Sequence, residues 1–370
     1  MGNKQGIYLD LKQPLCIMDG ASFESRKIYE KLQVTPEPEN YSGRIPWTVQ
    51  QQIAATNGIH FLNAVGHLKE YPIPPIPIKE AGGQKLFLDI GNGWGRWLVA
   101  AARKNYIPIG IDLRLEFCSV SRTVLKDNGF NGYTAVADLR SLPFLDNIFD
   151  VVWSFSVIQH THYQRMTGCL SHIQRILNPA GGYCYLEFPN KNGLHNRLGP
   201  ARKFAGTADD YDSWDVRYYT AREYRNIFGR FFDNFNYYNH SALGIGVLPG
   251  DFKYATGWIN KAGILMSRSL TRFFDVIPPL KAISDSIYIS CVKQIKEKND
   301  DRENISKFLK AHAANPGNNL NLVHILCCPA TQGPVRLSED GTEIISEKAR
   351  LAYQIKNDTP IMVTTEARSL

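Results

Sequence analysis

A run of alternating glycines in residues 86–97 (LFLDIGNGWGRW) constrains the fold of this 370-residue chain more than any other feature. Three apolar residues lead to an aspartate, glycines occupy every second position after it, and a helix-like segment follows at 96–105. This order predicts a buried strand, a glycine-rich turn and a helix, which together begin a nucleotide-binding βαβ unit. Because glycine has no Cβ, the backbone of such a turn can pass close to a ligand.

The spacing of the glycines distinguishes between two classes of cofactor. A dinucleotide-binding turn has the pattern G-x-G-x-x-G, whose third glycine would fall at position 96, where this chain has Arg96. The pattern here is D-x-G-x-G-x-G, which resembles the first motif of the class I S-adenosylmethionine-dependent methyltransferases. The resemblance implies S-adenosylmethionine as the cofactor, bound by Asp89, Gly91, Gly93 and Gly95.

Four more predicted strands follow the turn in the order of a parallel α/β sheet. They lie in YIPIGIDL, TAVADLRSLPF, FDVVWSFS and GGYCYLEFPN. These segments predict a Rossmann-like, doubly wound α/β fold. The resemblance implies a sheet of seven strands, and within the family this part of the chain is most similar to the ubiquinone and menaquinone methyltransferases.

Polar residues stand where these predicted strands end, at the sheet edge where a cofactor binds. Asp112 ends the second strand, where a carboxylate can bind both ribose hydroxyls or can cap the following helix. Asp138 ends the third strand, and the resemblance places this position near the adenine, with the backbone of Leu139 beside it. Leu113 and Ser154 complete the predicted cofactor-binding residues.

Methyl transfer requires an acceptor aligned with an activated methyl group, and a base where the acceptor is a hydroxyl or a protonated amine. His160, after the fourth strand, and Glu187, at the end of the fifth, are the predicted catalytic residues. A structural or cofactor-lining role is the alternative for His160. Further candidates are His162, Tyr163 and His195. The chain reads SFSV where enzymes acting on planar amino groups have an N/D-P-P-Y signature, which disfavours nucleobase and glutamine acceptors.

The chain is mildly basic, and the excess charge is unevenly distributed. Its net charge is +7, and residues 191–300 hold 16 Lys and Arg against 11 Asp and Glu. Four basic residues there either bind a phosphate or carboxylate of the acceptor or form a solvated loop balanced by the acids at 209–215: Lys191, Arg197, Arg202 and Lys203. The excess is modest for an RNA-binding protein.

Composition divides the chain into an N-terminal extension at 1–85, a methyltransferase domain at 86–293, a polar linker at 294–320 and a module at 321–370. The extension either covers the cofactor or packs as a helix on the sheet. Within the domain, residues 241–284 form an amphipathic, basic insertion. This insertion is either a lid packed on the sheet or a segment that lies on a membrane surface.

Residues 321–370 predict a compact β-rich module, because apolar residues alternate between Gly-Pro and Asp-Gly turns. CPATQGPVRL, ARLAYQIKNDTPIMV and the closing EAR resemble the small activator protein of eukaryotic tRNA, rRNA and release-factor methyltransferases, and more strongly its short bacterial homologues. Zinc-binding relatives have C-P-x-C, but Thr331 replaces the second cysteine here. We therefore expect no zinc and buried Cys327 and Cys328. The resemblance implies that the module contacts and stabilises the catalytic domain.

The cysteines and the hydropathy pattern indicate a cellular compartment. Seven cysteines form no C-x-x-C pair, the N-terminus has no signal pattern, and no apolar run approaches the ~20 residues of a membrane span. These features predict a cytoplasmic protein without a metal site. The first hypothesis is a methyltransferase for a small-molecule, sugar or lipid-linked acceptor. The alternatives are an RNA or protein methyltransferase with a built-in activator, and a non-catalytic S-adenosylmethionine-binding scaffold.

Overall fold

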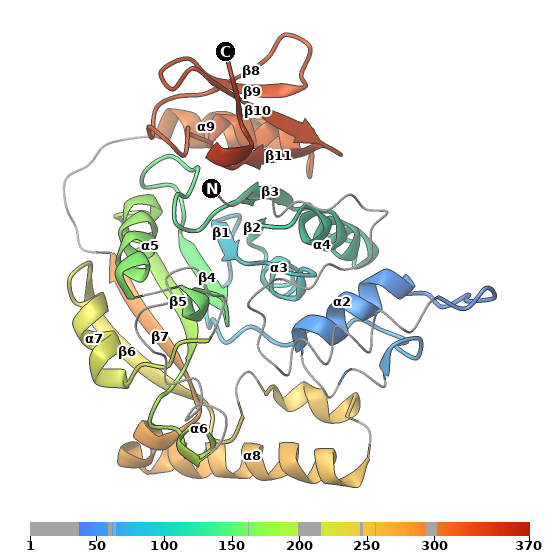
Figure 1. Cartoon of the computed structure of the whole chain (residues 1–370), viewed down its shortest axis with the longest axis vertical. Helices are drawn as coiled ribbons and strands as arrows, with labels where there is room; N and C mark the ends of the chain where they lie inside the picture. Colours follow the sequence, from blue (N-terminus) through green and yellow to red (C-terminus); the bar gives the residue numbers. More distant parts are fainter. Residues whose placement is uncertain are drawn as a thin grey trace, which may run out of the picture.

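The computed structural model describes residues 37–57, 61, 64–161, 163–198, 216–244, 247–255, 257–293 and 302–370. Its centre is a sheet whose first seven strands run in the order β6-β7-β5-β4-β1-β2-β3, with helices on both faces (Figure 1). The predicted Rossmann-like α/β fold is confirmed. These strands are β1 (Leu86–Ile90), β2 (Ile107–Asp112), β3 (Tyr133–Ala137), β4 (Val151–Phe155), β5 (Tyr183–Pro189), β6 (Phe232–Ser241) and β7 (Ser286–Lys293).

The five strands predicted from the apolar runs form the parallel centre of the sheet. β1 pairs in parallel with β2 and β4, β2 with β3, and β4 with β5. The residues of β1, β3 and β4 are all buried, as expected for strands that are covered on both faces. β7 is antiparallel to β5, and β6 is antiparallel to β7. β6 therefore ends, and β7 begins, at the carboxyl edge of the central strands.

Helices cover the two faces of the sheet in separate hydrophobic clusters. One face packs against α3 (Arg96–Ala102) and α4 (Leu115–Asp127), and α2 (Trp47–Asn57) of the extension packs on α3 and α4. The other face packs against α5 (Tyr163–Ile176) and α7 (Ala221–Phe228). α7 begins with a capping box between Thr220 and Glu223, as its sequence predicts.

The C-terminal module continues the sheet of the methyltransferase part. Its strands are β8 (Arg336–Leu337), β9 (Glu343–Ser346), β10 (Leu351–Lys356), β11 (Thr359–Met362) and β12 (Arg368–Ser369). β11 pairs in parallel with β3, and β10, β9 and β8 follow it outward (Figure 1). A loop contact joins the module to the domain as well, since the Cys327 N–H donates to the Pro143 carbonyl over 2.9 Å. Cys327 and Cys328 are buried.

The segment predicted to be a linker contains ordered structure. α9 (Arg302–Ala314) lies within it, followed by the 3-10 helix η6 (Asn319–His324). α9 is polar over most of its surface, but its Phe308 is fully buried and its ring lies 5.1 Å from that of Tyr133 in β3. The His312 Nδ1 also lies 2.7 Å from the Tyr133 hydroxyl. The predicted polar linker at 294–320 therefore contains a helix, and one aromatic side chain, Phe308, packs this helix against the sheet.

The insertion between β6 and β7 lies at the carboxyl edge of the sheet. Ser241 at the end of β6 and Pro189 at the end of β5 both pair with Ser286. The insertion contains η4 (Pro249–Lys253), α8 (Trp258–Val276) and η5 (Pro278–Ile283). α8 is attached to β6, where the Asn239 amide donates to the Thr271 carbonyl over 3.0 Å. Among the described helices, none is long and apolar enough to cross a membrane.

Candidate active site

The glycine-rich turn joins β1 to α3 and has the backbone conformation that glycine favours. Gly91, Gly93 and Gly95 have φ of 73°, 49° and 91°. A Cβ on Gly91 would lie 2.4 Å from Val157, whereas the nearest atom to a Cβ on Gly93 would be 4.0 Å away. The first glycine thus allows close packing, and Gly93 faces open space. Gly93 is the position of the turn where a ligand can approach the backbone.

Asp112 and the turn are joined by a hydrogen bond. The Gly93 N–H donates to the Asp112 Oδ2 over 3.1 Å, and the Arg114 N–H donates to the Oδ1 over 3.1 Å. Burial raises the pKa of Asp112 to about 6, against the opposing effect of these two N–H groups. The structure therefore brings Asp112 to the turn, and its role toward the ribose stays a prediction. The N-cap position of α4 is held by Arg114 and not by Asp112, so the capping alternative for Asp112 is wrong.

Asp89 lies inside β1, directly before the turn, and is fully buried. Within the described part of the chain neither of its carboxylate oxygens has a hydrogen-bond partner. Burial raises its pKa to about 8, and the nearby guanidinium of Arg96 opposes that rise. A buried carboxyl group without a partner is costly, and this is typical of a site completed by a ligand.

The other predicted cofactor-binding residues lie in β4 or directly after β2 and β3. Asp138 and Leu139 follow β3, and the Asp138 carboxylate accepts hydrogen bonds from the Nε and Nη2 groups of Arg140. Leu113 follows β2 and is partly buried. The Ser154 hydroxyl in β4 donates to the Ile90 carbonyl over 3.0 Å, which holds β4 against β1. Their roles toward a cofactor stay predictions.

A buried polar cluster lies on the α3 face of the sheet beside the turn. We use this name for Asp89, Arg96, Glu187, His240 and Asp251. Strand register explains how it forms: Phe155 in β4 pairs with Glu187 in β5, and Glu187 pairs with Tyr288 in β7. The His240 ring in β6 lies 4.6 Å from the Tyr288 ring.

Arg96 lies over the aromatic wall of this cluster. Its guanidinium carbon is 4.7 Å from the centre of the Phe155 ring and 5.3 Å from that of Trp97. Its charge acts on the four other members of the cluster and opposes the rise in pKa of each carboxyl group. Stacking on these two rings fixes the position of the guanidinium. Its positive charge there acts on the carboxyl groups of Asp89, Glu187 and Asp251.

The remaining members of the cluster have perturbed proton affinities. Glu187 is 1% exposed, accepts hydrogen bonds from the hydroxyls of Ser156 and Ser286, and has a pKa that burial raises. Burial lowers the pKa of His240 to about 3, and its buried Nε2 has no partner among the described residues. Burial also raises the pKa of Asp251 to about 6. Clusters of titratable side chains with shifted pKa values are typical of reactive sites.

The predicted catalytic residues have separate locations. Glu187 belongs to the buried polar cluster. His160 ends the 3-10 helix η2 (Ile158–His160) and is partly buried, and its carbonyl accepts a 2.8 Å hydrogen bond from Arg217. His195 is exposed on α6 (Leu194–Leu198), where its N–H donates to the carboxylate of Asp285. The side chains of His162, Tyr163, Arg202 and Lys203 lie outside the described residues, while Lys191 and Arg197 are exposed.

Sequence reasoning missed three members of the cluster. Arg96 was considered as the residue that breaks the dinucleotide pattern, and not as a site residue. His240 and Asp251 lie far from the motifs, in an aromatic-rich strand and in the insertion. One signal was present: a histidine at the carboxyl-edge end of a strand that precedes an insertion.

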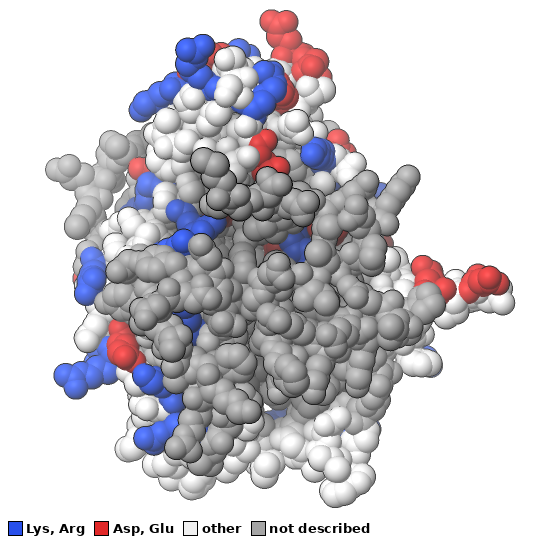
Figure 2. Space-filling view, viewed as in Figure 1, with Lys and Arg blue, Asp and Glu red and all other residues white. Residues whose placement is uncertain are grey.

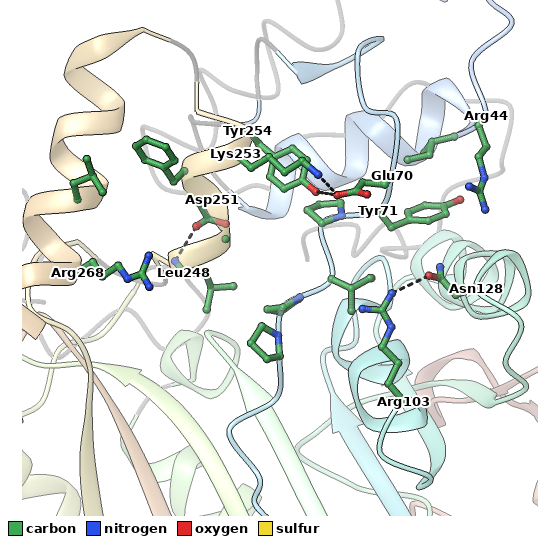
Figure 3. A pocket seen from close by; sticks show the side chains of 18 residues that line it. Arg44, Glu70, Tyr71, Arg103, Asn128, Leu248, Asp251, Lys253, Tyr254 and Arg268 are labelled. Carbon is green, nitrogen blue, oxygen red and sulfur yellow. Dashed lines mark hydrogen bonds and ion pairs between the residues drawn. The ribbon is translucent and has the colours of Figure 1, made fainter. Parts of the chain in front are cut away.

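A separate cavity of about 610 Å³ lies between the extension and the insertion (Figure 3). The Lys253 amine and the Tyr254 hydroxyl both contact the Glu70 carboxylate there, which ties the two segments together. Arg44, Arg103 and Arg268 also line it, whereas the glycine-rich turn does not. Asp251 is the member of the buried polar cluster that also lines this cavity. Across the described ranges, no three His, Cys, Asp or Glu side chains are placed to hold a metal ion.

Two family models match this chain. The model described as a methyltransferase domain matches residues 87–181, and the model of Trm112p-like proteins matches residues 319–358. The UPF0434 protein of Pseudomonas aeruginosa (strain LESB58) is 57% identical over 49 residues, which cover 13% of this chain and 80% of that protein. The UPF0434 protein of Ectopseudomonas mendocina is 51% identical over 51 residues, covering 14% and 84%.

Solved structures of methyltransferases are less similar in sequence to this chain than the UPF0434 proteins are. An S-adenosylmethionine-dependent methyltransferase from Methanosarcina mazei is 18% identical, with 60% of this chain and 100% of that chain covered and a TM-score of 0.43. One from Archaeoglobus fulgidus is 18% identical, with 58% and 88% covered and a TM-score of 0.37. The match of the family model to residues 87–181 supports a methyltransferase domain.

The residues at the carboxyl edge fit S-adenosylmethionine, the cofactor of this domain. The open space at Gly93 admits a ligand beside the backbone, and the Asp112 carboxylate is an acceptor for hydroxyl groups. The partnerless carboxyl group of Asp89 is available to a polar or cationic ligand. Through its C-terminal module the chain belongs to the UPF0434, Trm112p-like family, and it joins that module to an S-adenosylmethionine-dependent methyltransferase domain.

Proposed function

We propose that this chain methylates a hydroxyl-bearing small molecule, sugar or lipid-linked metabolite in the buried polar cluster. The observation that carries the proposal is the grouping of buried Glu187 with half-buried His240 beside the rings of Phe155 and Tyr288. Such a site suits a small acceptor group that enters a pocket, because a long basic groove for a nucleic acid backbone would instead carry exposed cations.

In this proposal Gly93, Asp89 and Asp112 hold the cofactor. S-adenosylmethionine supplies a methyl group that its sulfonium already activates, so the protein contributes alignment and the removal of a proton. The role of Glu187 follows from its environment. The hydroxyls of Ser156 and Ser286 orient its two oxygens, and its raised pKa makes it a stronger base than an exposed glutamate.

The other cluster members position the acceptor. The imidazole of His240 stays neutral at ordinary pH, because its pKa is lowered to about 3, and its Nε2 can accept or donate one hydrogen bond to a hydroxyl. The Arg96 guanidinium can stabilise negative charge that develops on the acceptor oxygen. His160 stays an alternative base, since it lies on the segment that follows β4. The sequence resemblance of this domain to ubiquinone and menaquinone methyltransferases fits an acceptor of this class.

A second candidate function is methyl transfer to RNA or protein. The C-terminal module favours it, because that module matches the Trm112p-like family. The module covers the β3 side of the sheet, and the buried polar cluster lies on the opposite side of β1. In this fused chain we assign the module a stabilising role and expect no separate activator partner.

The test is transfer of radiolabelled methyl groups from S-adenosylmethionine into a fractionated cell lysate by the full chain. We expect label in the small-molecule or lipid fraction, and Glu187→Gln to lower the rate by roughly a hundredfold or more while the affinity for S-adenosylmethionine is unchanged. Glu80→Gln, at an exposed position, is the matched control and should keep the full rate.

Label in RNA or protein would favour the second candidate. Absence of transfer together with tight cofactor binding would favour the scaffold. Full activity of Glu187→Gln would remove Glu187 as the base and make His160→Asn the next variant.

A further inference from the structure

α8 carries a stripe of exposed apolar side chains that no described part of the protein covers. Six large apolar residues of this one helix are between 48% and 80% exposed. The apolar stripe consists of Trp258, Ile259, Leu265, Met266, Phe273 and Val276. Isolated exposed apolar residues are normal, but a continuous group of this size marks an interaction surface.

The stripe follows the geometry of one helix face. At about 100° per residue its six members fall within an arc of roughly 120°. The buried residues of α8, Ile264, Ser267 and Phe274, fall on the opposite side, toward β6. There the Ser267 hydroxyl lies 3.0 Å from that of Ser241. The buried side of α8 thus contacts β6, while the apolar stripe faces away from the sheet.

Basic side chains line one edge of the apolar stripe. Lys261, Arg268 and Arg272 are all exposed and follow each other along the same flank of the helix. The acidic residue of α8 is Asp275, whose carboxylate lies 4.0 Å from the Lys281 amine. Long cationic side chains beside an apolar face can reach anionic headgroups while their aliphatic parts remain in the acyl boundary. This charge pattern selects an anionic lipid surface as the partner.

The position of α8 supports a surface contact and not a buried one. The helix crosses the outer end of the molecule, remote from the C-terminal module (Figure 1). Mostly uncharged side chains occupy that lower edge in the space-filling view (Figure 2). The insertion belongs to the carboxyl edge of the sheet, as does the glycine-rich turn. A membrane in contact with α8 would therefore lie beside the edge at which the acceptor is proposed to enter.

We propose that α8 lies in the headgroup region of an anionic membrane, with the apolar stripe inserted and Lys261 and Arg272 on lipid phosphates and carboxylates. No described helix, α8 included, is both long and apolar enough to cross a bilayer. The inference concerns a binding surface and holds whichever acceptor the enzyme methylates.

The test is sedimentation of the full chain with vesicles of phosphatidylcholine alone and of an equal mixture of phosphatidylcholine and phosphatidylserine. We expect binding to the mixed vesicles to be at least roughly tenfold tighter and to weaken in high salt. Met266→Glu/Phe273→Glu should remove binding. Leu309→Glu/Ala313→Glu adds the same charge at exposed positions of α9 and should leave binding intact.

A second variant keeps the two contributions separate. Lys261→Gln/Arg272→Gln should lose the preference for phosphatidylserine while retaining its thermal unfolding midpoint. The proposal is overturned if wild-type protein stays in the supernatant with both vesicles, or if Met266→Glu/Phe273→Glu sediments like wild type. It is also overturned if the stripe instead mediates a dimer, seen as a doubled mass that this double variant abolishes without any vesicle binding by wild type.

Discussion

At the scale of single residues, the carboxyl edge of the sheet concentrates buried charge. Asp89, Glu187 and Asp251 share the field of Arg96, although each is removed from bulk water. Keeping partnerless carboxyl groups inside a protein costs stability, and proteins retain such groups where they serve binding or catalysis. The cluster is therefore expected to trade stability for function, and Asp89 allows this to be measured.

Asp89→Asn should stabilise the protein at alkaline pH and not at acidic pH. The folded pKa of Asp89 is about 8, raised by burial from 3.8, so the folded state binds the proton more tightly than the unfolded state. The free energy of unfolding of wild type therefore falls as pH rises from about 4 to about 8, and the variant lacks this loss. Between about pH 5 and about pH 9, the variant should gain on the order of several kcal/mol relative to wild type.

Urea unfolding without added cofactor at the two pH values measures this gain. Asp358→Asn, at an exposed turn with positive φ, is the control and should show no pH-dependent difference. Equal effects of Asp89→Asn at both pH values would mean that Asp89 is ionised normally in the folded protein.

Sequence patterns locate the site residues that lie close together along the chain. The turn glycines and Asp112 belong to one βαβ unit, so their spacing along the chain fixes their spacing in space. The buried polar cluster depends instead on the register of five strands and on an insertion. His240 reaches Glu187 through β7, which is antiparallel and distant in sequence. Local periodicity carries no information about such a pairing.

At the scale of elements, strands with continuous apolar runs were predictable and weakly amphipathic segments were not. β1 to β5 are short, apolar and bounded by turn residues, which is the pattern of buried parallel strands. α9 has a mainly polar surface and a single fully buried anchor, Phe308, so composition favoured a linker.

Phe308→Ala should destabilise the protein by about 3–5 kcal/mol, because it leaves a cavity against Tyr133 in β3. Leu309→Ala, on the neighbouring and partly exposed position, should change the free energy of unfolding by about 0.5 kcal/mol or less. Urea unfolding of the two variants side by side provides the comparison. If both lose the same small amount, α9 does not anchor the module to the sheet.

At the scale of the whole molecule, one sheet runs through both parts of the chain. β11 covers the edge of β3, which would otherwise expose unpaired backbone groups. The sequence predicted a contact between the module and the domain through family resemblance. It did not predict strand addition, because nothing in the local pattern of β3 or β11 specifies the partner of a parallel edge. The outcome is one sheet that runs through the methyltransferase domain and the C-terminal module.

The central claim is that the turn at Gly93 holds the methyl donor, and titration calorimetry with S-adenosylmethionine tests it most directly. Gly93→Arg should abolish binding, because the new side chain fills the open space beside the turn. Gly129→Arg is the matched control, since Gly129 also has a positive φ and open surroundings but lies in the loop after α4. The account predicts wild-type affinity for Gly129→Arg and no measurable heat for Gly93→Arg. Wild-type affinity in Gly93→Arg would contradict it.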